Sequence, residues 1–346
     1  MTGVTDIKAQ VDVLPGLDPR APLLQINDLH VEFRTRDGVA KAVNGASFWL
    51  NPGETLAILG ESGCGKSVTA QAIMGILESP PGHITRGEVR YRGVDLLKLR
   101  EDERRRVRAN KIAMIFQDAL SALNPVYTVG FQLAELFRAH RGMSRGDAKN
   151  RAIELLDQVH IPGARSRVND YPHQFSGGMR QRVMIAMALA LDPEVLIADE
   201  PTTALDVTVQ AQIMGLLAEL QRQRNMGLIL ITHDMGVVAD VADRISVMYA
   251  GRVVEEAPVY DIYAAPGHPY TRALLESIPR LDLKGQQLTA IRGLPPALTD
   301  IPQGCAFNPR CGYAKEPCRQ DPAPPAYAIA PRRTARCHFF REVLGD

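Results

Sequence analysis

The sequence predicts an α/β fold in which a mainly parallel sheet is covered by helices. Short apolar runs that are typical of buried strands alternate with segments whose apolar residues recur at spacings of three and four, as in helices. One such strand, residues 55–59, leads through a glycine-rich loop into a helix, and another, residues 195–198, closes on Asp199 and Glu200. Alternating strands and helices are typical of a parallel, helix-flanked sheet.

Length, charge and hydropathy narrow the class of protein. The chain has 346 residues, enough for one large domain and a smaller one, and its 40 basic and 39 acidic residues leave a net charge of +1. This balance gives no overall field that would attract nucleic acid. The longest apolar run, residues 183–191, is far shorter than the roughly 20 residues that span a bilayer. The N-terminus lacks the basic flank and apolar core of a secretory signal, so we expect a cytoplasmic chain.

The N-terminal part of the chain predicts β structure. Residues 1–22 show no periodicity and are expected to form a flexible tail. Residues 23–33 and 39–50 alternate between apolar and polar side chains on either side of a polar turn, which predicts an antiparallel β subdomain ahead of the strand at 55–59. Residues 87–93 predict a further strand and turn.

The loop after the strand at 55–59 carries the strongest motif. It matches G-x-x-x-x-G-K-[S/T], in which glycines let N–H groups point inward and the following helix N-terminus adds partial positive charge. Lys66 would reach the terminal phosphates and the Ser67 hydroxyl would hold a magnesium ion. A glycine turn with a surface lysine is the alternative, but the strand–loop–helix context favours a nucleotide triphosphate site. The residues assigned to it are Gly60, Glu61, Ser62, Gly63, Cys64, Gly65, Lys66, Ser67 and Val68.

Cys64 is the one cysteine outside the C-terminal region. It lies beside Lys66 and near a helix N-terminus, and both features lower the pKa of a thiol. We nevertheless expect a small residue that the loop tolerates rather than a redox switch.

The middle of the chain predicts a helical subdomain at about residues 118–193. A strand over 111–116 precedes it and ends at Gln117, and helical spacing is clear over 129–160 and 183–191. Residues 100–108 interleave arginines with acids, which favours a salt-bridged helix face over a basic surface for acidic partners.

Two anionic side chains follow the apolar strand at 195–198. In a phosphate-binding fold, Asp199 would hold the magnesium ion without touching it directly, and Glu200 would polarise the water that attacks the γ-phosphate. Two acids after a strand can also simply begin a turn, here beside Pro201. Their pairing with the glycine-rich loop favours the catalytic interpretation.

A second candidate anion site begins at Ser176, which is followed by two glycines and a helix. A hydroxyl and exposed N–H groups at a helix N-terminus bind anions, although an ordinary N-capped glycine turn has the same sequence. Two phosphate-binding helix starts in one chain suggest that each nucleotide is shared between two chains.

Over residues 23–280 these motifs resemble, in order and spacing, the nucleotide-binding subunit of ABC transporters. The matching elements are the loop at 60–67, Gln117, Ser176–Arg182, Asp199–Glu200, Ala204–Asp206 and His233. The resemblance implies a P-loop NTPase core of the ABC ATPase type, bound ATP with Mg²⁺, and a head-to-tail dimer of such subunits.

The resemblance also implies roles for single residues. Gln117 would sense the γ-phosphate, belong to the Mg²⁺ site with Ser67 and Asp199, and face the membrane subunits. The part of one chain that closes on the ATP of the other would be Ser176, Gly177, Gly178 and Met179.

Three further roles follow from the same resemblance. Asp206 would bridge the dimer and His233 would contact the γ-phosphate. Phe33 would stack on adenine. A histidine or an aromatic residue at a strand end is more often a packed core residue, which is the alternative for His233 and Phe33.

Departures from the commonest signature narrow the subfamily. Met179 replaces its glutamine and Phe175 its leucine, and Phe175–Arg182 together with Phe116–Pro125 is similar to the subfamily that imports dipeptides, oligopeptides and sometimes nickel. From about residue 281 the composition shifts to Pro, Cys and Arg, and residues 292–311 resemble the small Cys-rich C-terminal extension of that subfamily.

The remaining four cysteines all lie in that extension, with five, six and eighteen residues between successive members. In a cytosolic chain they indicate a metal site rather than disulfides, and their spacing matches neither zinc ribbons nor common ferredoxins. The resemblance favours a [4Fe-4S] cluster, with Zn²⁺ as the alternative and His338 as a spare ligand. The expected ligands are Cys305, Cys311, Cys318 and Cys337.

The sequence is therefore interpreted as the ATPase subunit of a di- or oligopeptide importer on the cytoplasmic side of the cell membrane. Its implied partners are a second, non-identical ATPase subunit, two transmembrane permease subunits and an extracytoplasmic substrate-binding protein, with no nucleic acid. A nickel or other small-solute importer is the runner-up. A non-transport ABC ATPase is disfavoured because the chain holds one cassette and no heptad run, and a non-catalytic subunit because the motif residues are present.

Overall fold

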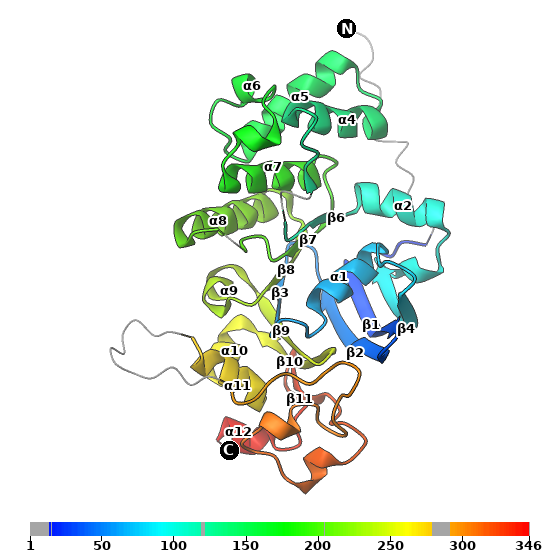
Figure 1. Cartoon of the computed structure of the whole chain (residues 1–346), viewed down its shortest axis with the longest axis vertical. Helices are drawn as coiled ribbons and strands as arrows, with labels where there is room; N and C mark the ends of the chain where they lie inside the picture. The colour runs from blue at the N-terminus through cyan, green and yellow to red at the C-terminus, as the bar shows by residue number, and fades with distance from the viewer. Residues whose placement is uncertain (1–13, 15, 119–121, 204, 279–290, 346) are drawn as a thin grey trace. The chain divides into compact units, whose positions relative to one another are not determined.

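The computed structural model describes residues 14, 16–118, 122–203, 205–278 and 291–345 (Figure 1). Most of the expected tail at 1–22, the motif residue Ala204 and the start of the extension lie outside these ranges. The chain divides into two compact units, which we describe separately. Unit 1 contains residues 51–53 and 91–228 with the residues before 24, and unit 2 contains residues 24–50, 54–90 and 229–346.

A β subdomain forms the first part of unit 2. Strands β1 (Leu24–Thr35) and β2 (Gly38–Leu50) pair antiparallel from Leu24 opposite Leu50 to Thr35 opposite Gly38, and β4 (Gly82–Tyr91) lies on the other edge of β1. This confirms the predicted antiparallel element. Helix α1 (Lys66–Met74) contacts β1 and β2.

The second sheet of unit 2 carries the strand before the phosphate loop. That strand, β3 (Thr55–Leu59), is wholly buried between β8 (Gly227–Thr232), in which the boundary between the units falls, and β9 (Arg244–Tyr249). The pairing of β3 with β9 is parallel, as the α/β prediction requires, and β10 (Arg252–Pro258) continues antiparallel from β9.

The C-terminal extension continues this sheet instead of folding apart from it. Strand β12 (Arg333–Ala335) pairs antiparallel with β10, and β11 (Tyr327–Ala330) pairs with β12 (orange to red in Figure 1). The remaining helices of unit 2 are α9 (Met235–Val241), α10 (Val259–Ala264), α11 (Pro269–Glu276) and α12 (Phe340–Leu344).

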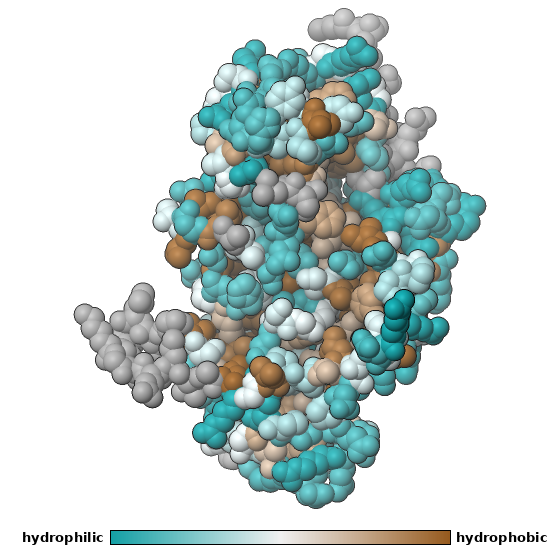
Figure 2. Space-filling model, viewed as in Figure 1, coloured by the Kyte–Doolittle hydropathy of each residue, from teal (hydrophilic) through white to brown (hydrophobic). Residues whose placement is uncertain are grey.

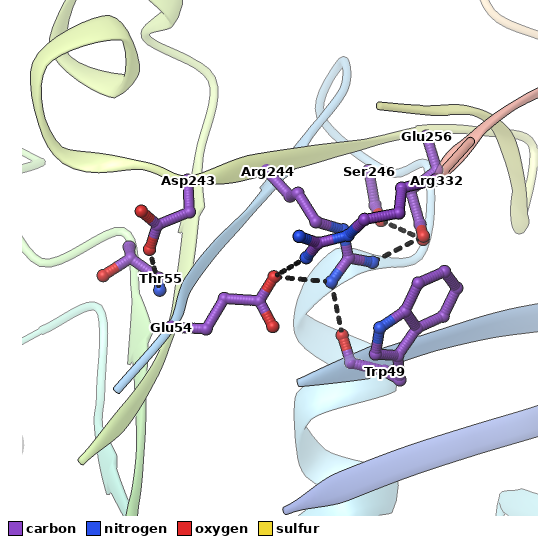
Figure 3. A network of polar contacts seen from close by, with 8 residues as sticks. All are labelled: Trp49, Glu54, Thr55, Asp243, Arg244, Ser246, Glu256 and Arg332. Atoms are coloured by element: carbon purple, nitrogen blue, oxygen red, sulfur yellow. Dashed lines mark hydrogen bonds and ion pairs between the residues drawn. The ribbon is translucent and has the colours of Figure 1, made fainter. Parts of the chain in front are cut away.

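A buried ion-pair network connects strands β9 and β10 to the residue that precedes β3 (Figure 3). The Arg244 guanidinium, 1% exposed, donates to Glu54 at 2.8 Å and to Glu256 at 2.5 Å, and it lies 4.0 Å above the Trp49 ring. Arg332 of the extension reaches the same Glu54 carboxylate at 2.9 Å. Because removing one partner of a buried pair leaves an uncompensated charge, this network ties β2, β3, β9, β10 and the extension together.

Unit 1 contains the predicted helical subdomain. Helices α4 (Val129–Arg141), α5 (Arg145–Gln158), α6 (Ala164–Arg167) and α7 (Gly177–Leu189) pack together (green in Figure 1). Unit 1 also contains the parallel strands β6 (Ile112–Ile115) and β7 (Val195–Asp199), the short strand β5 (Val94–Asp95), and helices α2 (Glu101–Asn110) and α8 (Val207–Arg224).

Helix α2 has the salt-bridged face that its sequence predicts. Its arginines pair with acids on the same helix, for example Arg104 with Glu101 at 3.3 Å and Arg106 with Asp102 at 3.5 Å. The face shown in Figure 2 is mostly hydrophilic, with hydrophobic residues in small separate patches. Among the residues that the structure describes, no helix is both long and apolar enough to cross a membrane.

Candidate functional site

The phosphate loop, residues 60–67, joins the buried end of β3 to the start of α1 in unit 2. Two of its glycines are required by close packing as well as by positive φ. A Cβ on Gly60 (φ 154°) would stand 2.3 Å from the carbonyl oxygen of Met248, and one on Gly65 (φ 106°) would stand 2.3 Å from that of Ala42. The loop is therefore pressed against β9 and β2, and no other residue fits at these two positions without moving the backbone.

The Lys66 ammonium lies inside the loop. Its side chain is 5% exposed, and Nζ donates to the carbonyl oxygens of Gly60 at 2.7 Å and Glu61 at 3.1 Å. A cation held on two carbonyl oxygens can exchange them for phosphate oxygens with little movement of the backbone. The phosphate-binding role of Lys66 stays a prediction.

The expectation that the pKa of Cys64 would be lowered is wrong. The Cys64 thiol is buried, and burial raises its pKa by more than Lys66, the nearest cation, lowers it. A helix N-terminus depresses a thiol pKa only where the thiolate keeps some solvation. The interpretation of Cys64 as a small residue tolerated by the loop agrees with this burial.

Unit 1 brings Gln117 and Glu200 together. The parallel register sets Ile115 of β6 opposite Ala198 of β7, so the residues two positions further on lie at neighbouring strand ends. Gln117 Nε2 donates to Glu200 Oε2 at 2.8 Å. The acid that precedes Glu200, Asp199, is the buried last residue of β7.

Sequence reasoning missed Thr203, whose Oγ1 donates to the same Glu200 oxygen at 2.9 Å. The Pro-Thr-Thr run after Glu200 has no motif of its own that would reveal this contact. Two contacts on Oε2 fix the carboxylate direction, and the backbone of Glu200, at φ 47°, lies in the left-handed region that non-glycine residues seldom adopt.

The signature segment, Ser176–Met179, begins helix α7. Ser176 is the N-cap, with its Oγ accepting from the Met179 N–H at 3.4 Å, and the helix starts at Gly177, six residues before the predicted start of its apolar run. Ser176 and Gly177 are exposed. Gly178 packs instead against α8, where a Cβ would stand 2.6 Å from Cγ1 of Val209.

The other predicted site residues lie at element ends. Asp206 is exposed and caps α8, accepting from the Val209 N–H at 3.0 Å. His233 is exposed just after β8, so it is not the packed core histidine of the alternative reading. Phe33 is half-buried in β1 opposite Ala40.

The four cysteines of the extension line one small cavity of about 10 Å³ together with apolar side chains such as Phe307 and Phe339. Burial first, and the neighbouring thiols to a smaller extent, raise the pKa of Cys305 to about 11 and that of Cys337 to about 12. Among the described residues, no group of three or more His, Cys, Asp or Glu side chains is arranged to hold a metal ion.

Two further residues, Tyr270 and Arg310, contact the phosphate loop without any motif in the sequence. The Tyr270 hydroxyl accepts from the Glu61 N–H at 2.8 Å, and Arg310 pairs with the Glu61 carboxylate. Both contacts join residues more than 200 positions apart, so no local pattern could have predicted them.

Comparison with known proteins identifies two family matches. The ABC transporter family model matches residues 43–203, and the model of the oligopeptide/dipeptide transporter C-terminal region matches residues 254–318. The latter range includes three of the four cysteines of the extension.

Curated relatives match over nearly the whole chain. The chain is similar to the oligopeptide transport ATP-binding protein OppD of Salmonella typhimurium, with 52% identity over 92% of this chain and 94% of that protein. It is also similar to the dipeptide transport ATP-binding protein DppD of Escherichia coli, with 48% identity over 93% of this chain and 98% of that protein.

Among solved structures, the chain is similar to the ATP-binding cassette MJ0796 in a dimeric post-hydrolysis state bound to ADP and Pi. The TM-score is 0.61 and the identity 29%, over 68% of this chain and 98% of the other. The fold, both family models and the relatives agree: the chain belongs to the ABC transporter family, and within it to the ATP-binding proteins of oligopeptide and dipeptide transport.

Proposed function

We propose that this chain works as one of two ATPase subunits that close head to tail around ATP and so drive the uptake of di- and oligopeptides. As a member of its family it is an ATP hydrolase and the ATP-binding subunit of a peptide importer. The roles of single residues, the arrangement of the dimer and the partners are the proposal.

The observation that carries the proposal is the Gln117–Glu200 pair at the ends of β6 and β7. Glu200 is the general base that polarises the attacking water, and Gln117 couples the position of that base to the γ-phosphate. Asp199 and Ser67 serve the Mg²⁺ ion, while Lys66 neutralises the terminal phosphates. His233, exposed after β8, contacts the γ-phosphate.

The head-to-tail dimer is supported by the exposed start of α7. Ser176 and Gly177 are exposed at a helix N-terminus, where a phosphate of a second chain would be favoured. The similar cassette with ADP and Pi was solved as a dimer. We infer a second, non-identical ATPase subunit as the partner, with Asp206 at the contact between the two.

A peripheral position on the cytoplasmic face of the membrane, against two permease subunits fed by a substrate-binding protein, completes the assembly. Its support is an exposed apolar patch at the start of the helical subdomain. Val126, Tyr127 and Phe131 are 69%, 47% and 44% exposed, and the two rings stack at 4.8 Å. Exposed apolar patches of this kind mark docking surfaces for proteins.

Peptide import is tested by deleting the subunit in cells that depend on peptides for an amino acid. Deletion should abolish growth on short peptides and give resistance to toxic peptide analogues. The wild-type gene should restore both phenotypes, whereas Lys66→Ala should not. Unchanged peptide uptake together with a nickel-dependent growth defect would favour the nickel importer instead.

We further propose that the extension holds a [4Fe-4S] cluster through Cys305, Cys311, Cys318 and Cys337. The support is that all four line one cavity with apolar walls, although they lie up to 32 positions apart in the sequence. Four thiolates in an apolar cavity need a positive centre to balance their charge, and a cluster supplies it. Its binding energy would add to the sheet pairing that already anchors the extension.

Metal analysis distinguishes the cluster from zinc. Anaerobically purified protein should absorb broadly in the visible and contain about four irons and four sulfides per chain. Changing Cys318 to Ser should remove most of the iron, whereas changing Cys64, the matched cysteine outside the extension, should leave it in place. Stoichiometric zinc without sulfide would replace the cluster by a zinc site, and an ordered, metal-free extension would contradict both.

A further inference from the structure

One arginine of the cysteine-rich segment reaches directly into the phosphate loop. Arg310 lies in the short 3₁₀ turn Asn308–Arg310, between Cys305 and Cys311. Its two terminal nitrogens donate to the two carboxylate oxygens of Glu61, at 2.6 and 2.9 Å. A bidentate pair of this kind fixes direction as well as distance, and the Arg310 side chain is only 5% exposed.

Arg310 is itself held on several sides. Its Nε donates to the carbonyl oxygen of Arg292 at 2.9 Å, and Nη1 lies 3.3 Å from the Tyr249 hydroxyl. The guanidinium also lies 5.8 Å from the ring centres of Tyr249 and Phe307. The position of Arg310 therefore depends on how the surrounding segment of the extension is placed.

Glu61 makes several of the contacts of the phosphate loop. Its N–H donates to the Tyr270 hydroxyl at 2.8 Å, and its carbonyl oxygen accepts from Lys66 Nζ at 3.1 Å and from the Cys64 N–H at 3.3 Å. A shift of Glu61 therefore moves one of the two carbonyl groups that hold the phosphate-binding lysine.

The four-cysteine site, defined by Cys305, Cys311, Cys318 and Cys337, uses the same segment. Residues 305–311 supply two of its thiols and the cavity-lining ring of Phe307. The same segment carries Arg310. The Phe307 ring also packs on Tyr249 and Tyr270, at 5.2 and 5.3 Å between ring centres. Whatever fixes or releases the thiols of this segment therefore fixes or releases Arg310.

We propose that Arg310 is a positioning residue of the phosphate loop, and that through it the state of the four-cysteine site sets the affinity of the loop for ATP. With Arg310 in place, the Glu61 carboxylate is neutralised and the loop backbone is held in position. If the segment loosens, an uncompensated carboxylate stands in the loop and repels the triphosphate. The inference rests on the proposed binding of ATP at Lys66.

Nucleotide titration of the purified full-length chain tests the first half. A fluorescent ATP analogue with Mg²⁺ is titrated against the wild type, Arg310→Gln, the double variant Arg310→Gln/Glu61→Gln, and Lys315→Gln. Lys315 is the matched control, because its ion pair with Glu342 lies in the same extension, is half exposed and includes no residue of the phosphate loop.

Arg310→Gln should weaken binding of the ATP analogue about tenfold. A loss of this size lies within the range of coupling energies between residues in contact. The double variant should recover most of the loss, because it removes the uncompensated carboxylate, and Lys315→Gln should bind like the wild type. A wild type that binds no ATP refutes the proposed function itself. A wild type that binds, with Arg310→Gln binding equally well, refutes only the role of Arg310.

A double-mutant cycle tests whether the cysteines act on ATP binding through Arg310. Cys311→Ser should weaken ATP binding in the wild-type background and have little further effect in Arg310→Gln, because both changes release the same contact. Additive effects would overturn the coupling. If Arg310→Gln does not fold, Arg310→Lys replaces it. This variant keeps the positive charge but cannot form the bidentate pair with Glu61, so we expect a smaller loss of ATP affinity.

Discussion

Three features orient the carboxylate of Glu200. Gln117 and Thr203 both donate to its Oε2, and its backbone lies at φ 47°. A left-handed residue other than glycine costs energy that the surrounding structure must offset, and such residues cluster where function requires a set direction.

Glu200→Gln keeps the shape of the side chain and removes its charge. ATP binding should persist, because the contacts of Lys66 are untouched. The rate of hydrolysis should fall, because the transition state loses on the order of 2–4 kcal/mol of stabilisation. Single-turnover hydrolysis and equilibrium binding measure the two effects separately. Thr203→Val is the matched control, since it removes one hydrogen bond but no charge. Wild-type hydrolysis by the Gln variant at its own site would exclude Glu200 as the base.

At the scale of single residues, the sequence predicted the residues that belong to a local motif. Lys66 and Glu200 follow strands in recognisable motifs, so their positions could be predicted. Thr203, Tyr270 and Arg310 could not, because their contacts depend on chain segments brought together only by the fold. The error over Cys64 has the same origin, since its burial is set by packing rather than by neighbours in sequence.

Between elements, the packing of helix α7 on α8 explains a glycine that the motif alone assigns to nucleotide binding. Gly178 has no room for a Cβ, because Val209 Cγ1 of α8 would lie 2.6 Å away. Gly177, one residue earlier, would place its Cβ at an ordinary 3.6 Å from Leu205. The two glycines of the signature segment therefore differ in their structural role.

Gly178→Ala should destabilise the protein by about 1–3 kcal/mol, as overpacking does, whereas Gly177→Ala should cost little because alanine favours the helix. Thermal or denaturant unfolding of the two variants checks this difference. Adding Val209→Ala to Gly178→Ala should recover most of the lost stability. Equal stability of the two glycine variants would show that the helices can separate without cost.

The elements that the sequence predicted well include the wholly apolar strands that lead into a motif. Buried strands β3 and β7 appear within one residue of their expected bounds. Strands β11 and β12 were not predicted, because they have four and three residues and lie between turns. Their pairing with β10 is a tertiary contact, and it makes the extension part of the sheet that carries the phosphate loop.

For the molecule as a whole, the phosphate loop and the four-cysteine site, which are far apart in the sequence, are connected within unit 2. The extension touches the loop through Arg310 and the buried network through Arg332. The exposed signature segment, by contrast, is proposed to serve the nucleotide of a partner chain. Activity of one subunit should therefore depend on residues of the other.

The most direct test of this dependence is Ser176→Arg in the assembled transporter, with each of its two ATP sites followed separately by photolabelling. The bulky cation should abolish nucleotide trapping and hydrolysis at the partner's site, while ATP still binds at this chain's own Lys66 site before closure. Loss confined to this chain's own Lys66 site would contradict the head-to-tail arrangement on which the account depends.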